Sequence, residues 1–236
     1  MPTDAHAASA EFYATPRGAV AARLVRERLA RLWPELKGQS VLGVGYAQPY
    51  LRLWRGHAAR CIALTPPAVA ATRWPMTGKG LTCVAEEHAL PFPDLSFDRV
   101  LLVHGLEAAE NRRVLLREVW RVLKDDGRLL VLVPNRTGLW AYAESTPFGH
   151  GQPFSVGQIG RLLADSLFRA ERSDAALYMP PTGFMLRSAV YAERIGPRIA
   201  PGFGGVILVE ALKDAYAALP LAGAPRRRLV VEEAAA

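Results

Sequence analysis

The chain has 236 residues, half of them hydrophobic, and carries a formal net charge of +7 at pH 7. This length is enough for one α/β domain with a large core, and no apolar run is long enough to cross a bilayer. We expect a cytoplasmic protein, because no basic segment followed by an apolar one opens the chain. The two cysteines, Cys61 and Cys83, lie in predicted strands. No Cys/His spacing suggests a metal site.

The positive charge comes mainly from arginines that are spread along predicted helices. Such scattered charge makes nucleic acid an unlikely partner. The one dense basic cluster, 226–228, lies in a C-terminal segment, 223–236, that we expect to be a disordered tail.

Apolar periodicity predicts alternating helices and strands from residue 18 to residue 133. Helices are expected at 18–33, from Pro49 onward, from Pro66-Pro67 onward, and at 107–123. Strands are expected at 40–44, 60–64, 81–84, 99–103 and 128–133. This alternation predicts parallel pairing with right-handed crossovers.

The pattern changes after Asn135. Residues 136–154 form a loop rich in Gly, Pro and aromatic residues that is too long for a plain connector. The remaining predicted elements are a helix at 155–168 with Ser155 as its N-cap, a strand-like segment at 175–179, a helix at 188–195 and a closing strand at 204–210.

Two segments carry the most specific pattern. Residues 90–98, Leu-Pro-Phe-Pro-Asp-Leu-Ser-Phe-Asp, lead into an apolar strand, and residues 123–133 place a Lys-Asp-Asp-Gly turn before another one. This order resembles the middle of the class I S-adenosylmethionine-dependent methyltransferases, in the type 11 subgroup that includes ubiquinone- and biotin-pathway enzymes. The resemblance implies an α/β fold with a Rossmann-like seven-stranded sheet, mostly parallel with a C-terminal antiparallel hairpin, and helices on both faces.

The same resemblance suggests one domain over residues 1–222. Within it, we expect an N-terminal helical cap at 1–37, a cofactor-binding core at 38–135, and a lid loop with the closing hairpin at 136–222.

The family binds S-adenosylmethionine at the turn after the first strand, where ligands of open parallel sheets bind. The resemblance therefore implies that Gly43, Gly45, Tyr46 and Ala47 contact this cofactor. The family has an acid at the position of Gly43 and three glycines after it, of which this chain keeps Gly45.

Two further cofactor positions follow the next strands. Leu64, beside Thr65, stands where the family places a ribose-binding acid, and no Asp or Glu occurs between Glu35 and Glu86. Glu86, with Glu87 next to it, matches the family acid that contacts adenine. A dinucleotide cofactor is disfavoured, because the glycine pattern lacks its third glycine and its ribose acid.

Methyl transfer needs an aligned nucleophile and, for O or N acceptors, removal of a proton. His104 is the candidate base and lies at the cleft lip that faces cofactor and substrate in the family; a packed core histidine is the alternative. Glu107 is either a second cleft residue or an acid favoured by a helix N-terminus. Trp140, Tyr142 and His150 are expected in a lid over the acceptor, although loop aromatics also pin loops to the body.

Two functions remain open from sequence. The first is a methyltransferase that acts on an unidentified acceptor, expected to be a small molecule. The second is a catalytically degenerate, methyltransferase-like binding or regulatory subunit with a protein partner, as the missing acids at Gly43 and Leu64 suggest.

Overall fold

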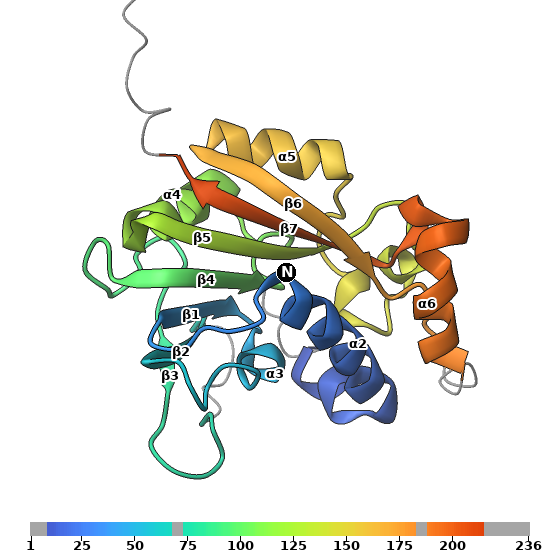
Figure 1. Cartoon of the computed structure of the whole chain (residues 1–236), viewed down its shortest axis with the longest axis horizontal. Coiled ribbons are helices and arrows are strands. Elements are labelled where there is room, and N and C mark those ends of the chain that lie inside the picture. The colour runs from blue at the N-terminus through green and yellow to red at the C-terminus, as the bar shows by residue number, and fades with distance from the viewer. Residues whose placement is uncertain (1–8, 68–72, 183–187, 215–236) are drawn as a thin grey trace, which may run out of the picture.

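The computed structural model describes residues 9–67, 73–182 and 188–214. Their strands form one sheet in the order β3-β2-β1-β4-β5-β7-β6 (Figure 1). The strands are β1 (Ser40–Gly45), β2 (Arg60–Thr65), β3 (Thr82–Val84), β4 (Phe97–Val103), β5 (Leu123–Pro134), β6 (Phe168–Ala176) and β7 (Val206–Lys213). β7 is antiparallel to both of its neighbours, and the other pairs are parallel. The predicted seven-stranded sheet with a closing antiparallel hairpin is confirmed.

Helices cover both faces of this sheet (Figure 1). The helices are α2 (Pro16–Leu32), α3 (Gln48–Leu51), α4 (Arg112–Val122), α5 (Val156–Asp165) and α6 (Ala189–Ile199), with short 3-10 turns η1 (Leu139–Tyr142), η2 (Pro147–Gly149) and η4 (Pro201–Phe203). The side chains of α2 and α3 join one buried cluster, and those of α4 and α5 join the other. Successive strand residues alternate between the two clusters, as expected for strands buried on both faces.

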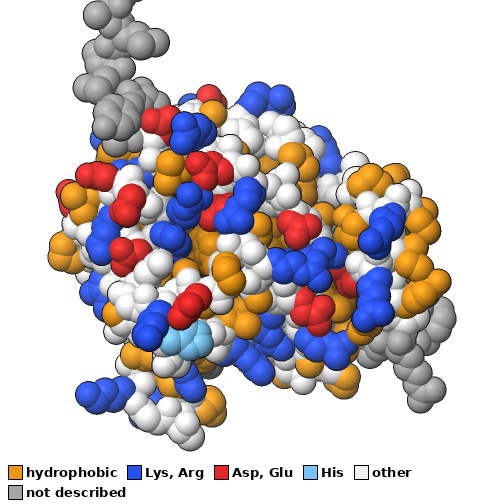
Figure 2. All heavy atoms as spheres, in the orientation of Figure 1, with side chains coloured by type: hydrophobic (Ala, Val, Ile, Leu, Met, Phe, Trp, Pro, Cys, Tyr) orange, Lys and Arg blue, Asp and Glu red, His pale blue; other side chains and the backbone are white. Residues whose placement is uncertain are grey.

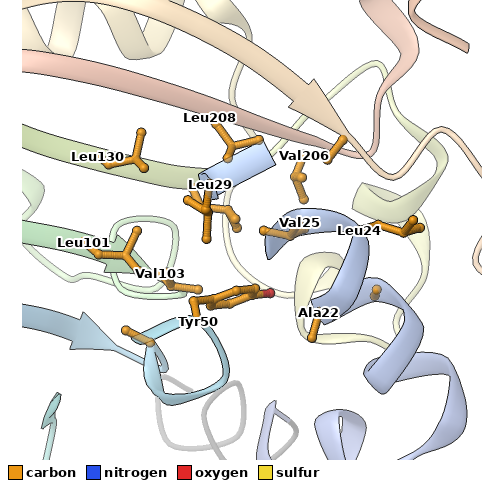
Figure 3. Close-up of a cluster of buried hydrophobic side chains, with 14 of the residues drawn as sticks. Ala22, Leu24, Val25, Leu29, Tyr50, Leu101, Val103, Leu130, Val206 and Leu208 are labelled. Atoms are coloured by element: carbon orange, nitrogen blue, oxygen red, sulfur yellow. The ribbon is translucent and has the colours of Figure 1, made fainter. Parts of the chain in front are cut away.

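The helix α2 shows how sequence produces one of these layers. The Oγ1 atom of Thr15 accepts a hydrogen bond from the backbone N of Gly18 at 3.0 Å, and Pro16 occupies the first turn, where its missing N–H costs nothing. Val25 and Leu29 point from this helix toward the sheet (Figure 3). Both are fully buried.

Some element bounds differ from the predicted ones. The predicted helix 107–123 begins only at Arg112 and is capped by Asn111. The strand β5 already begins at Leu123, and an irregularity after this residue separates two stretches of pairing with β4. The strand expected at 175–179 runs from Phe168 to Ala176 instead. Most of its residues are exposed or partly exposed at the edge of the sheet, so no apolar pattern marks where it begins. The N-cap predicted at Ser155 is confirmed, and it forms a capping box with Gln158.

Some predictions fall outside the described residues, namely the course of the helix expected after Pro66-Pro67 and the C-terminal tail 223–236. In the described part of the chain, no helix is both long and apolar enough to cross a membrane. On the face shown in Figure 2, Lys and Arg side chains are interspersed with Asp and Glu side chains.

The carboxyl ends of four strands meet at one edge of the sheet. Gly45 of β1 pairs with Val103 of β4, and Thr65 of β2 pairs with Val84 of β3. The loops that follow β1, β2, β3 and β4 therefore lie together, which is where open parallel sheets bind ligands.

Candidate functional site

The turn after β1 is held tightly against β4. Gly45 has a φ of +81°, and a Cβ atom built on it would lie 2.1 Å from the carbonyl oxygen of Val103. The backbone N of Tyr46 donates a hydrogen bond to that same oxygen at 2.8 Å. Only glycine fits at this position, since any other residue would clash and would be strained by the positive φ.

At position 43, glycine is required because neighbouring side chains leave no room for a Cβ atom. A Cβ atom there would lie 2.6 Å from the Cβ of Ala47 and 2.7 Å from Cδ1 of Leu51. The turn and α3 thus pack directly onto β1, and no space remains for the acidic side chain that the family resemblance places here.

A chain of hydrogen bonds crosses the end of β4. The Tyr13 hydroxyl lies 2.7 Å from the Tyr50 hydroxyl and 2.8 Å from Nε2 of His104. On the other side of the imidazole, Nδ1 lies 3.1 Å from Oε1 of Glu107. His104 and Glu107 are buried, with 3% and 4% of their surface exposed. A carboxylate paired with one imidazole nitrogen leaves the other nitrogen available to take a proton.

The backbone of His104 is held in an unusual conformation. Its φ of 53° lies in the left-handed region, which a non-glycine residue adopts at some cost in energy. The imidazole lies 4.8 Å, centre to centre, from the ring of Phe148 in η2. The residue after β4 is therefore fixed by both its hydrogen bonds and its packing.

A cavity of about 570 Å³ opens beside this network. Its walls come from the segments that follow β2, β3 and β4 and from the first turn of α4. The lining residues are Pro66, Pro67, Glu86, Glu87, His88, Ala108, Ala109, Glu110, Asn111, Val114 and Leu115. This volume is within the range of small-molecule sites.

The two adjacent glutamates differ in their surroundings. Glu86 is exposed, whereas Glu87 is partly buried and its Oε1 atom has no hydrogen-bond partner among the described residues. Burial, followed by repulsion from Glu107 and then Glu86, raises the pKa of Glu87 to about 7. A partly buried carboxyl group with an unpaired oxygen at a cavity wall is suited to binding a polar ligand.

Buried polar atoms without partners are concentrated at this edge of the sheet. In the described part of the chain, five of the eight such atoms belong to Gln48, Thr65, Glu87 and Glu107, which follow or end β1, β2, β3 and β4. An adenosyl group offers hydroxyls, an amino group and ring nitrogens to such atoms. The residues present therefore fit the adenosine half of S-adenosylmethionine.

The site residues predicted from sequence are only partly brought together. Glu86 and Glu87 line the cavity, while Leu64 is fully buried in the core and leaves Thr65 as the polar group at the end of β2. His104 and Glu107 lie together in the hydrogen-bond network, outside the cavity lining.

The expected lid is largely attached to the body. Trp140 is fully buried, its Nε1 atom donates to the carbonyl oxygen of Met179 at 2.7 Å, and it packs on Phe148. Tyr142 is 73% exposed and His150 is partly exposed. None of these three lines the cavity.

Sequence reasoning missed Tyr13 and Tyr50. Tyr13 lies 91 residues from His104 in sequence, and no motif links the two. The only local signal was Thr15-Pro16, which marks the start of α2 and thereby places Tyr13 just before it.

Residues 41–131 match the model of a family described as a methyltransferase domain. Over 48 residues, the chain is 52% identical to the ubiquinone/menaquinone biosynthesis C-methyltransferase UbiE of Hahella chejuensis, a match that covers 20% of this chain and 19% of that protein. It is 47% identical over 49 residues to the demethylmenaquinone methyltransferase of Thermotoga maritima, which covers 21% of each. These matches span about a fifth of the length of the curated relatives.

Solved structures share the fold over most of the chain. The methyltransferase in a complex with the Trm112 activator of Haloferax volcanii aligns with a TM-score of 0.63 at 18% identity, covering 84% of this chain and 93% of that one. A possible histamine N-methyltransferase of Thermotoga maritima aligns with a TM-score of 0.59 at 16% identity, covering 84% and 91%. The [4+2]-cyclase SpnF aligns with a TM-score of 0.57 at 19% identity, covering 82% and 81%. At these identities the likeness concerns the fold alone.

Proposed function

We propose that this protein is a methyltransferase that acts on a small-molecule acceptor. Its residues 41–131 form a type 11 domain of the class I S-adenosylmethionine-dependent methyltransferases. One observation carries the proposal: buried polar atoms without partners gather at the carboxyl ends of β1 to β4, where a ligand would satisfy them. Structural polar groups in a core are usually paired, so these unpaired atoms, of which that of Glu87 lies at the cavity wall, favour a binding role.

The adenosine half of the cofactor would be held by groups at these strand ends. Glu87, at the cavity wall, would accept hydrogen bonds from donors of the ligand, and Thr65 would offer its hydroxyl in place of the family acid after β2. The narrow turn at Gly45 would bring the backbone close to the ligand. Bound S-adenosylmethionine supplies an electrophilic methyl group.

His104 would act as the base for an acceptor hydroxyl or amine. With the ring proton assigned to Nδ1, the ring donates to Glu107, which orients it, and the lone pair on Nε2 faces the Tyr13 hydroxyl, whose place the acceptor would take. The proton from the acceptor would move to Nε2, and the buried carboxylate of Glu107 would stabilise the resulting imidazolium. The burial of both groups excludes water from this proton transfer.

The acceptor class is tested by measuring S-adenosylhomocysteine formed from S-adenosylmethionine. The purified protein is incubated with S-adenosylmethionine and one of two fractions of a cell extract: the dialysable fraction, which holds small molecules, or the retained fraction, which holds macromolecules. We expect turnover with the dialysable fraction and a loss of about 10²-fold or more in the His104→Gln variant. Turnover with the retained fraction only would exclude a small-molecule acceptor.

The second candidate is a methyltransferase-like regulatory subunit. It is favoured by the packing of Ala47 and Leu51 against Gly43, which excludes the family acid, and by the likeness to a methyltransferase that is solved in a complex with an activator protein. Binding of S-adenosylhomocysteine without turnover on either fraction would support this candidate and contradict the first.

A further inference from the structure

The ring of Tyr13 fills a recess that the rest of the chain builds at the end of β4. Its hydroxyl lies within hydrogen-bond distance of His104 and Tyr50, as described above. Its ring stacks on that of Tyr46, with centres 5.4 Å apart and planes 10° from parallel. The recess thus offers a flat aromatic surface and two polar partners for a single hydroxyl, which is the complement of a phenol.

The direction of the hydrogen bonds makes this recess selective for a proton donor. The carboxylate of Glu107 can only accept, so we assign the proton on the imidazole to Nδ1. Nε2 of His104 then accepts from the Tyr13 hydroxyl, and that hydroxyl oxygen accepts from Tyr50. A hydroxyl in this position is aligned to give its proton to His104.

Tyr13 lies between an anchored residue and an exposed stretch of chain. It belongs to a helical turn at 9–14, where the preceding Phe12 is only 4% exposed and packs on Trp140 and Phe148. The following residues, Ala14 and Thr15, are exposed. Phe12 therefore anchors the turn, while Tyr13 is part-buried at its edge.

We propose that Tyr13 is an internal occupant of the acceptor subsite, and that the acceptor is a small phenol whose hydroxyl takes its place between His104 and Tyr50. That the bound phenol is the methyl acceptor depends on the function proposed above, whereas the existence of a phenol-binding site does not. The O–H proton of the bound phenol moves to Nε2 of His104, and the oxygen keeps the bonding electron pair. Glu107 stabilises the imidazolium that forms.

The test is calorimetric titration of the full chain with p-cresol, which has the shape of the tyrosine side chain, and with toluene, which lacks the hydroxyl. The variants Tyr13→Phe and Tyr50→Phe each remove one phenol hydroxyl from the same network. Tyr142→Phe is the matched control, since Tyr142 is 73% exposed and its hydroxyl donates to the carbonyl oxygen of Arg136 at 2.8 Å, outside the recess.

The proposal predicts opposite effects for the two network variants. Tyr13→Phe should bind p-cresol about tenfold more tightly than the wild type, because the competing hydroxyl is gone, and adding Tyr50→Phe to Tyr13→Phe should weaken binding about tenfold relative to Tyr13→Phe. Tyr142→Phe should not differ from the wild type. Toluene should bind at least about tenfold more weakly than p-cresol to every variant that retains Tyr50.

Two results would overturn the proposal: no p-cresol binding to the wild type and Tyr13→Phe, or equal binding of p-cresol and toluene. A purely structural Tyr13 predicts the first result. Titration with S-adenosylhomocysteine on the same samples separates this inference from the proposed function. If S-adenosylhomocysteine binds and p-cresol does not, only the phenol subsite is wrong; the reverse result retains the phenol subsite and contradicts the methyltransferase.

Discussion

Glu107 fixes the imidazole of His104 in a buried pair, with Oε1 of the carboxylate 3.1 Å from Nδ1 of the ring. The two residues are three apart in sequence and lie in the loop between β4 and α4, outside any regular element. The pair therefore depends on the left-handed backbone of His104, which turns the chain so that both side chains converge.

This relationship predicts the effect of Glu107→Gln. The amide keeps the shape but can no longer stabilise an imidazolium, so we expect turnover to fall about 10²-fold. The measurement is kcat with S-adenosylmethionine at saturation. A kcat equal to that of the wild type would show that Glu107 does not act through His104.

The raised pKa of Glu87 predicts a pH dependence of stability. Because this pKa is about 7 in the folded chain and near 4.5 when unfolded, the folded state binds more protons between these values. The contribution of Glu87 is thus fully present below pH 4.5 and is lost as pH rises through 7, with a slope of at most about 1.4 kcal/mol per pH unit.

The variant Glu87→Gln should remove this slope. Its free energy of unfolding, measured in urea between pH 4 and pH 8, should match the wild type at pH 4 and exceed it at pH 8. Glu86→Gln, at the exposed neighbouring position, is the control and should retain most of the wild-type slope, because burial is the largest cause of the raised pKa and Glu86 the smallest. Parallel pH curves for Glu87→Gln and the wild type would contradict the burial of this carboxyl group.

Introducing a side chain at Gly43 should destabilise the fold. In Gly43→Ala, the new Cβ would overlap Ala47 and Leu51, and we expect a loss of about 1–3 kcal/mol in urea unfolding. Gly160→Ala is the matched control, because no atom lies within 4 Å of its new Cβ in α5 and the helix should gain about 0.5–1 kcal/mol. A stable Gly43→Ala would show that α3 is free to move away from β1.

Trp140→Phe should affect stability and leave ligand binding intact. The variant loses the hydrogen bond to Met179 and leaves a buried carbonyl oxygen without a partner, which costs about 1–3 kcal/mol. Thermal unfolding measures this cost, and calorimetry measures affinity for S-adenosylhomocysteine. If affinity falls while stability does not, Trp140 belongs to a mobile lid after all.

The parallel core of the fold was predictable because its strands are buried on both faces and read as short apolar runs. The outer strand β6 was harder, since its exposed middle residues, 169–173, give no apolar signal. Its extent is set by pairing with β7, a contact that local sequence does not encode.

The site was predictable only in part, because several of its contacts also depend on the fold and not on local sequence. A motif placed Glu86 and Glu87 after β3, but only the fold determines which of two adjacent carboxyl groups points inward. The contact of Tyr13 with His104 joins distant segments and leaves no periodic pattern. The exclusion of an acid at Gly43 likewise depends on how α3 packs, which sequence alone does not reveal.

The central claim is that the strand ends of β1 to β4 hold an adenosyl ligand through Glu87, and calorimetric titration with S-adenosylhomocysteine tests it most directly. We predict micromolar affinity for the wild type that rises with pH as Glu87 loses its proton. Glu87→Gln should weaken binding about tenfold or more at pH 8, and Glu86→Gln should have little effect. Absence of binding at millimolar ligand, or equal loss in both variants, would contradict the account.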